Sequence, residues 1–284
     1  MNRALVVGAA ALALVVTGCS AKARPDIRSV TITASEPAAG RYAFSVAAAV
    51  AAGAARIHFT NRGTLPHDAQ LVRVDGTHSA QEVIATIRTD GAPIPDWLHY
   101  EGGVGTLGHG RSANADLTLV RGRYFVIDTG IDEDSIALAA AGAIAPLEVV
   151  EGTSAANVPA AKNIATVTAV DYGFVVQGLS RGTASIRFVN AGSQPHQFEA
   201  APIRAGRTLD DVKRSLAPDG SSQEQVSPLD LSNAVWAATL DAGKSEIATV
   251  TVRPGRYAFF CLLHDRQGGP AHLRLGMLDE VEIK

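Results

Sequence analysis

The sequence predicts an all-β protein made of two tandem β-sandwiches, each with a short helical insertion. Short Val, Ile and Phe runs alternate with polar residues and are interrupted by 27 Gly and 13 Pro, a pattern typical of strands and turns. Two blocks of sequence recur in the same order about 130 residues apart, which indicates a duplicated domain. Hydrophobic residues make up 46% of the chain and charged residues 19%, so we expect packed cores rather than disorder.

Composition also excludes several classes of protein. The net charge is −3 and no Lys/Arg run occurs, which argues against nucleic acid as a partner. The two cysteines, Cys19 and Cys261, are too few for a disulfide scaffold. The chain has no Gly-x-Ser-x-Gly elbow, Walker loop or dinucleotide fingerprint, so serine hydrolases and nucleotide-binding enzymes are disfavoured.

The N-terminus is predicted to be a targeting segment over residues 1–18. Arg3 precedes an apolar stretch over 4–16, which is short for a membrane span. The sequence Val16-Thr17-Gly18-Cys19 resembles the lipobox of bacterial lipoproteins. That resemblance implies cleavage before Cys19 and a diacylglyceryl group on its sulfur, which would anchor the protein on the extracytoplasmic face of the cell membrane. An ordinary secretory signal with a chance cysteine is the alternative.

Two aligned windows define the repeat. Residues 55–74 align without a gap with residues 184–203, and residues 109–128 align with residues 242–261. In each window seven of twenty positions are identical. Because both windows occur in the same order, we infer two homologous domains of similar length.

The repeat sets the predicted domain boundaries. A tether over 19–28 leads into a first domain over 29–150, and a small-residue linker over 151–161 leads into a second domain over 162–284. Residues 81–87 and 210–216 occupy corresponding places and have apolar residues about four apart. Each is therefore predicted to form one or two helical turns inserted into its sandwich.

Strand periodicity orients the chemically interesting cysteine. Tyr257, Phe259 and Cys261 alternate with their neighbours, so they share one face of a strand. This alternation points Cys261 into the sandwich interior together with two aromatic rings. An unpaired thiol outside the cytoplasm is open to oxidation, so we expect this one to be buried or to bind a metal.

Soft and imidazole side chains gather near the ends of the second repeat. Two imidazoles, a thiolate and a distant thioether form the ligand set of a blue-copper electron-transfer site. Zinc would also accept two His and one Cys but gains nothing from a nearby Met. The candidate ligands are His196, Cys261, His272 and Met277, with His264 as an alternative to His272.

The order of these motifs resembles that of cupredoxins. Asn190-x-Gly192 precedes His196, Pro254-Gly255-x-Tyr257 leads to Cys261, and His272-x₄-Met277 follows. The resemblance implies that both repeats are cupredoxin-like Greek-key sandwiches, with a type 1-like copper near one end of the second.

The spacing departs from the family pattern, because ten residues separate Cys261 from His272. His264 gives a Cys-x₂-His spacing, but Gly269 stands where the Met would follow. The sequence around Asp265 to Gly269 is typical of a turn that absorbs the extra length, so we prefer His272.

The first repeat lacks the rest of the site. It keeps His67, but Asp128 stands at the position of Cys261 and Ala143 at that of Met277. This contrast predicts one copper per chain, in the second domain.

Three function classes follow from this reading. Copper nitrite reductases and multicopper oxidases have a His directly beside the cysteine, whereas Phe260 and Leu262 flank Cys261 here, so we expect no enzyme. The remaining classes are an electron carrier with a redox protein partner, a copper-handling protein, and a metal-free scaffold or interaction lipoprotein.

Overall fold

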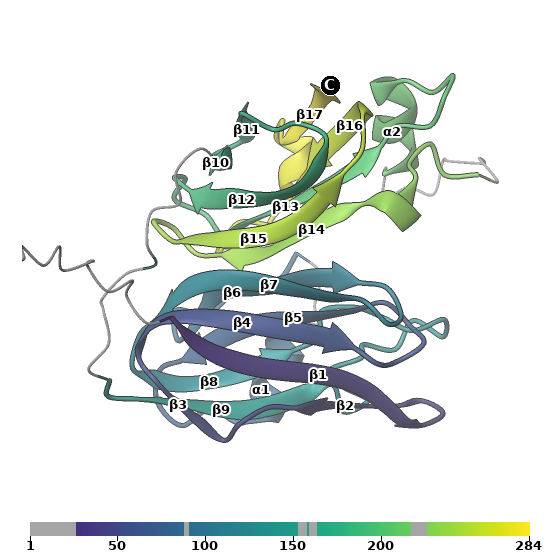
Figure 1. The fold of residues 1–284 in the computed structure, drawn as a ribbon. Coiled ribbons are helices and arrows are strands. Elements are labelled where there is room, and N and C mark those ends of the chain that lie inside the picture. Colours follow the sequence, from purple (N-terminus) through teal and green to yellow (C-terminus); the bar gives the residue numbers. More distant parts are fainter. Residues whose placement is uncertain (1–26, 88–90, 153–157, 159–163, 217–225) are drawn as a thin grey trace, which may run out of the picture.

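The computed structural model describes residues 27–87, 91–152, 158, 164–216 and 226–284. It confirms an all-β protein of two tandem β-sandwiches, each with one short α-helix (Figure 1). The predicted targeting segment and most of the tether and linker lie outside the described residues, so the lipid anchor stays a prediction. No helix in the described ranges has the length and apolarity to cross a membrane.

The first sandwich follows the order that the repeat predicts, with one additional short strand, β3. Its helix α1 follows the strand that begins at His67 and covers the predicted insertion over 81–87. The elements are β1 (Arg28–Ala38), β2 (Arg41–Ser45), β3 (Ala49–Ala51), β4 (Gly53–Asn61), β5 (His67–Val74), α1 (Ala80–Ile87), β6 (Leu98–Leu107), β7 (Ser112–Leu119), β8 (Gly122–Ile127) and β9 (Ile144–Val150).

The second sandwich repeats this order without a counterpart of β3. Helix α2 again follows the strand that begins with a histidine. The elements are β10 (Ala165–Val170), β11 (Gly173–Gln177), β12 (Gly182–Asn190), β13 (His196–Pro202), α2 (Leu209–Ser215), β14 (Val235–Leu240), β15 (Ser245–Val252), β16 (Gly255–Phe260) and β17 (Leu278–Ile283), with single 3₁₀ turns at Leu231–Asn233 and His272–Arg274.

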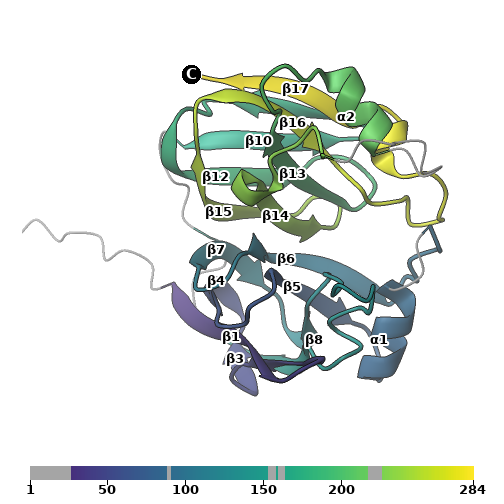
Figure 2. The same ribbon diagram turned by 90° about the vertical axis from the view of Figure 1, so that its right-hand side faces the viewer.

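Both helices begin at equivalent capping boxes. In α1 the Ser79 hydroxyl accepts from the Glu82 N–H at 3.3 Å, while the Glu82 carboxylate accepts from the Ser79 N–H at 2.7 Å. Thr208 and Asp211 form the same reciprocal pair at the start of α2. These bonds satisfy N–H groups that a helix start leaves unpaired. Each helix buries one valine against its own sandwich, on the right-hand side of Figure 2.

The two sandwiches are joined by strand pairing, so each sheet runs through both of them. One sheet has eight strands, with β7 of the first sandwich beside β15 of the second, and the other has nine, with β6 beside β14. Both junctions are antiparallel: Ile247 lies opposite Asp116, and Leu240 lies opposite Glu101. Since β7 and β15 are repeat equivalents, as are β6 and β14, the sandwiches are related by an approximate two-fold axis at the junction (Figure 1).

Strand alternation places the cysteine as predicted. Tyr257, Phe259 and Cys261 belong to the core between the two sheets of the second sandwich. Ala258 and Phe260, on the opposite face of β16, pack in the cluster that α2 covers. One strand therefore serves two cores, and the end of β16 delivers Cys261 to the sandwich interior.

Candidate metal centre

A turn fixed by an asparagine positions the first histidine. The Asn190 amide donates to the Gln194 carbonyl at 2.7 Å and to the Leu240 carbonyl at 2.8 Å, while its oxygen accepts from the Gly192 N–H at 2.9 Å. The bonds to Gln194 and Gly192 close the turn between β12 and β13, and the bond to Leu240 ties this turn to the end of β14. They hold His196 as the first, fully buried residue of β13.

A carboxylate shares this turn with the histidine. Asp171 accepts from the Ser193 N–H at 2.8 Å and hydroxyl at 2.6 Å, and lies 2.6 Å from Nε2 of His196. A Cβ at Gly192 would lie 2.2 Å from Asp171 Oδ1 and 2.8 Å from His196 Nε2. The glycine of the motif is therefore required by the close approach of this carboxylate and imidazole.

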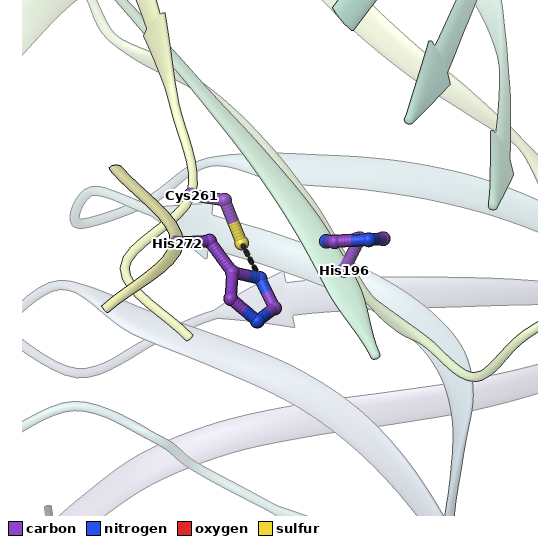
Figure 3. A group of neighbouring side chains, drawn as sticks. All are labelled: His196, Cys261 and His272. Carbon is purple, nitrogen blue, oxygen red and sulfur yellow. Dashed lines mark hydrogen bonds between the residues drawn. The ribbon is translucent and has the colours of Figure 1, made fainter. Parts of the chain in front are cut away.

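Three buried ligand side chains converge at the end of the second sandwich (Figure 3). One ligand atom from each of His196, Cys261 and His272 lies within 4.8 Å of the others. The Cys261 sulfur is 3.5 Å from Nδ1 of His272, and none of the three side chains is measurably exposed. In the part of the chain that the structure describes, no second group of three His, Cys, Asp or Glu ligand atoms is as close.

Carboxylates orient both imidazoles. Nε2 of His272 lies 3.1 Å from Asp265, whose carboxylate also accepts from the Tyr172 hydroxyl at 2.8 Å. Both histidines thus direct Nε2 to a carboxylate, which leaves Nδ1 as the nitrogen available to bind a metal ion. The buried Nδ1 of His196 has no hydrogen-bond partner among the described residues.

Burial sets the protonation state of these groups. It lowers the pKa of His272 to about 4, helped by the neighbouring His196, and it also lowers the pKa of His196. Both imidazoles are therefore neutral at neutral pH, the state that binds a metal. Burial raises the pKa of Cys261 to about 12, although the N–H groups of Gln197 and Leu263 donate to the sulfur and oppose the shift. A thiolate here needs a cation beside it.

Met277 lies in the same core as Cys261. Its side chain is fully buried there. Its carbonyl accepts from the Cys261 N–H at 3.3 Å, and its own N–H donates to the His272 carbonyl at 3.0 Å. The segment from His272 to Met277 is thereby fixed against the cysteine.

His264 lies outside this cluster. Its Nδ1 contacts the Gly269 carbonyl, and its ring lies beside Gly91 of the first sandwich. The Gly268 N–H donates to the Asp265 carbonyl at 2.8 Å, which confirms the turn expected in this loop. The residues between Cys261 and His272 therefore contact the first sandwich, while His272 returns to the cysteine.

The equivalent place in the first sandwich is filled by an ion pair. Nδ1 of His67 lies 2.6 Å from Asp128, and Nε2 lies 3.2 Å from Glu36. Burial opposes protonation of His67, but the hydrogen bonds and charges of the two carboxylates raise its pKa overall. The Asp128 N–H donates to the Ala143 carbonyl at 3.0 Å, as Cys261 does to Met277. This bond confirms the sequence equivalence of these positions.

Some residues of the site were missed by sequence analysis. Asp171, Asp265 and Tyr172 come from turns with no fixed spacing to the histidines, so no local motif marks them. The sequence did contain a signal for Leu138, the counterpart of His272, because residues 138–143 align without a gap with residues 272–277. The structure agrees: the Leu138 carbonyl accepts from the Ala143 N–H at 2.9 Å, as the His272 carbonyl does from the Met277 N–H. The first sandwich thus replaces three of the four candidate ligands.

Comparison with known proteins gives matches to solved structures alone. No protein-family description and no curated protein matches the chain. An auracyanin from the photosynthetic bacterium Roseiflexus castenholzii is 18% identical over 42% of this chain and 94% of its own, with a TM-score of 0.25. A multicopper oxidase is 17% identical over 91% of this chain and 89% of its own, with a TM-score of 0.26. A copper nitrite reductase from Nitrosomonas europaea is 12% identical over 91% and 94%, with a TM-score of 0.27. Likenesses of this size say nothing about activity.

Proposed function

We propose that the second sandwich binds one copper ion and that the protein transfers electrons. The ligands would be His196, Cys261 and His272, with the Met277 thioether as a weaker fourth. The observation that carries the proposal is the convergence of three buried donor groups within 4.8 Å, including an imidazole nitrogen with no partner in the described structure. Such a donor set fits copper, because thiolate and thioether suit Cu(I) and imidazole suits both oxidation states.

The surrounding residues support electron transfer over copper delivery. Bound copper would supply a one-electron couple between Cu(I) and Cu(II). Asp171 and Asp265 fix the two imidazoles, and backbone N–H groups fix the sulfur, so the donors are held in place by the fold itself. Their complete burial excludes water and disfavours ready exchange of the ion. The geometry of a site held in this way changes little when the copper ion gains or loses an electron.

The same observations favour a carrier over an enzyme. Phe260 and Leu262 flank Cys261 in the chain, so no imidazole adjoins the cysteine to lead to a second copper. Within the described ranges, the group of three close His, Cys, Asp or Glu ligand atoms is the one in the second sandwich. The oxidase and reductase names belong to the proteins compared above, whose likeness to this chain is low.

We further propose that the carrier is anchored through Cys19 on the extracytoplasmic face of the cell membrane. Support comes from the lipobox-like sequence that ends at this residue. Two acyl chains suffice for stable anchoring. A redox protein at the same surface would be the partner, and the net charge of −3 gives no reason to expect nucleic acid.

Titration of the purified chain with Cu(II) tests the copper proposal. We expect one equivalent to bind with an intense thiolate-to-copper band that bleaches reversibly on reduction. Stoichiometric binding without that band would favour copper handling instead. Absence of stoichiometric binding would favour the metal-free scaffold.

Two histidine variants form a matched pair for the ligand assignment. His272→Ala should abolish the visible band because it removes a donor beside the sulfur. His264→Ala should leave the band largely intact because this ring lies outside the cluster. Cys261→Ser should lose the band in every case. The reverse behaviour of the two histidine variants would show that the Cys-x₂-His arrangement binds the metal.

A further inference from the structure

A polar cavity of about 70 Å³ lies at the junction of the two sandwiches. Residues of β5 and β6 line it from the first sandwich, and residues of β13 and β14 line it from the second. This volume exceeds what one water molecule needs. Thr129, at the wall of the cavity, is exposed, so the space can be reached from solvent.

The approximate two-fold axis gives an internal comparison for this cavity. Gln70 and Glu199 occupy equivalent positions in the repeats. The Gln70 amide donates to the Thr239 carbonyl at 3.1 Å and accepts from its N–H at 2.7 Å, which closes the junction on that side. The Glu199 carboxyl instead bonds to Gln197 of its own strand. Among the described residues, the second half of the junction therefore lacks the equivalent clasp.

Glu199 is left with one carboxylate oxygen without a partner. Its Oε1 accepts from the Gln197 amide at 2.5 Å, but the buried Oε2 has no hydrogen-bond partner among the described residues. The side chain is 4% exposed and lines the cavity. An unsatisfied buried carboxylate oxygen is costly, so this atom indicates a missing ligand.

A second carboxylate enters the cavity from the other sandwich. Asp68 is 7% exposed and accepts from the Thr129 hydroxyl at 2.5 Å. Burial raises the pKa of Asp68 to about 8 and that of Glu199 to about 8, and the charge of Asp68 contributes to the latter. Two acidic groups thus share one cavity, and each would ionise more readily beside a positive charge.

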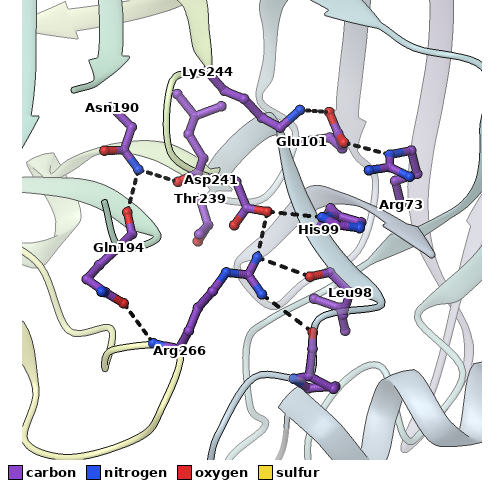
Figure 4. Close-up of polar contacts among 12 residues, drawn as sticks. Arg73, Leu98, His99, Glu101, Asn190, Gln194, Thr239, Asp241, Lys244 and Arg266 are labelled. Atoms are coloured by element: carbon purple, nitrogen blue, oxygen red, sulfur yellow. Dashed lines mark hydrogen bonds and ion pairs between the residues drawn. The ribbon is translucent and has the colours of Figure 1, made fainter. Parts of the chain in front are cut away.

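Basic side chains at the junction are committed elsewhere. Lys244 of the second sandwich bonds to Glu101 at 2.7 Å, and Arg266 bonds to Asp241 at 2.6 Å (Figure 4). Arg73 also pairs with Glu101, at 3.0 Å. None of the described residues that line the cavity is a lysine or an arginine. The counter-charge must therefore be a proton or a free cation.

We propose that Asp68 and Glu199 bind a calcium-type divalent cation in this cavity. The donors available are all oxygens, from two carboxylates, glutamine amides and threonine hydroxyls, and Ca²⁺ accepts such mixed, irregular sets. Mg²⁺ demands a stricter octahedron and keeps its water, and copper prefers the sulfur and nitrogen donors of the other site. Because one carboxylate comes from each sandwich, the cation would clamp the junction where the glutamine clasp is missing.

Calorimetric titration of the purified full-length chain with CaCl₂ at neutral pH tests this site. We expect one Ca²⁺ per chain, weaker binding of Mg²⁺, and a higher melting temperature with millimolar Ca²⁺, because a ligand that binds the folded state stabilises it. Glu199→Gln should lower calcium affinity by at least about tenfold, since it removes one charged donor. This variant should fold, because it places at position 199 the residue that already occupies the equivalent position 70.

Two controls separate this cavity from other acidic and metal-binding groups. Glu246→Gln makes the same chemical change at a buried junction carboxyl that does not line the cavity, and it should keep calcium binding. Cys261→Ser should also keep it, because the thiol belongs to the copper proposal. The proposal would be wrong if the unmodified chain did not bind millimolar Ca²⁺. It would also be wrong if Glu199→Gln and Asp68→Asn both bound Ca²⁺ as the unmodified chain does. Either result would show that protons alone neutralise Asp68 and Glu199.

Discussion

Glu246 makes the stability of this protein depend on pH in a way that one substitution should reveal. Its side chain is 1% exposed at the junction, where Oε2 accepts from the Gly103 N–H at 2.9 Å and Oε1 has no partner in the described structure. Burial raises its pKa from 4.5 to about 8. The folded protein therefore keeps this proton at neutral pH, whereas the unfolded chain has released it. The free energy of unfolding must fall as pH rises from about 4.5 to about 8.

The size of the effect follows from the two pKa values. Each pH unit between them costs about 1.4 kcal/mol, so Glu246 should lower the free energy of unfolding by about 2 to 3 kcal/mol between pH 5 and pH 7. Glu246→Gln removes this titration. The new amide N–H groups lack an acceptor and cost about 1–3 kcal/mol, but that cost is the same at every pH.

Urea denaturation of both proteins across this pH range measures the difference. Other titrating groups are shared by the two proteins, so they cancel in the comparison. The stability of Glu246→Gln relative to the parent chain should rise steadily towards alkaline pH. Glu148→Gln, on the exposed face of β9, is the matched control and should leave the profile unchanged. If the free energies of unfolding of the parent chain and Glu246→Gln changed in parallel with pH, Glu246 would not be a buried carboxyl that stays protonated at neutral pH.

Three further outcomes are expected. Gly192→Ala should destabilise the chain by about 1–3 kcal/mol and weaken the copper band, because the new methyl group would lie 2.2 Å from Asp171 Oδ1. The control Gly108→Ala should do neither, because its methyl group meets no atom within 4 Å. Equal stability of the two variants in urea denaturation would contradict this packing argument. Asp265→Asn should lower copper affinity by about 10- to 100-fold in a competition titration, and an unchanged affinity would remove this carboxylate from any role at the site. Cys19→Ser should release the protein from the membrane fraction or leave it unprocessed, and a membrane-bound mutant of normal mature mass would disprove the lipid anchor.

The sequence was sufficient for the architecture of each sandwich but not for their junction. Alternation along β16 placed Tyr257 and Phe259 in the core because a strand has a side-chain period of two. The junction depends on β6, whose buried Glu101 breaks that alternation and finds its partners Arg73 and Lys244 in two different sandwiches. A partner that lies far away in sequence leaves no periodic signal.

The sequence was sufficient to predict the donor residues of the candidate site, but not the carboxylates that orient them. Cys261 and His272 were identifiable by residue type and order, and the structure brings them together with His196. The carboxylates that orient the imidazoles belong to other turns, and Asp171 precedes its histidine by 25 residues. Gly63 shows that the motif itself is structural: a Cβ there would lie 2.6 Å from His67 Nε2 in the sandwich that has no cysteine.

The pairing of β6 with β14 and of β7 with β15 also protects the protein from aggregation. In either sandwich alone, these strands would be sheet edges with unpaired N–H and C=O groups, which recruit strands from other molecules. The duplication removes four such edges by turning them against one another. An isolated sandwich should therefore self-associate even if it folds, and the first repeat has a reason to persist that is independent of metal: it covers the open flank of the second.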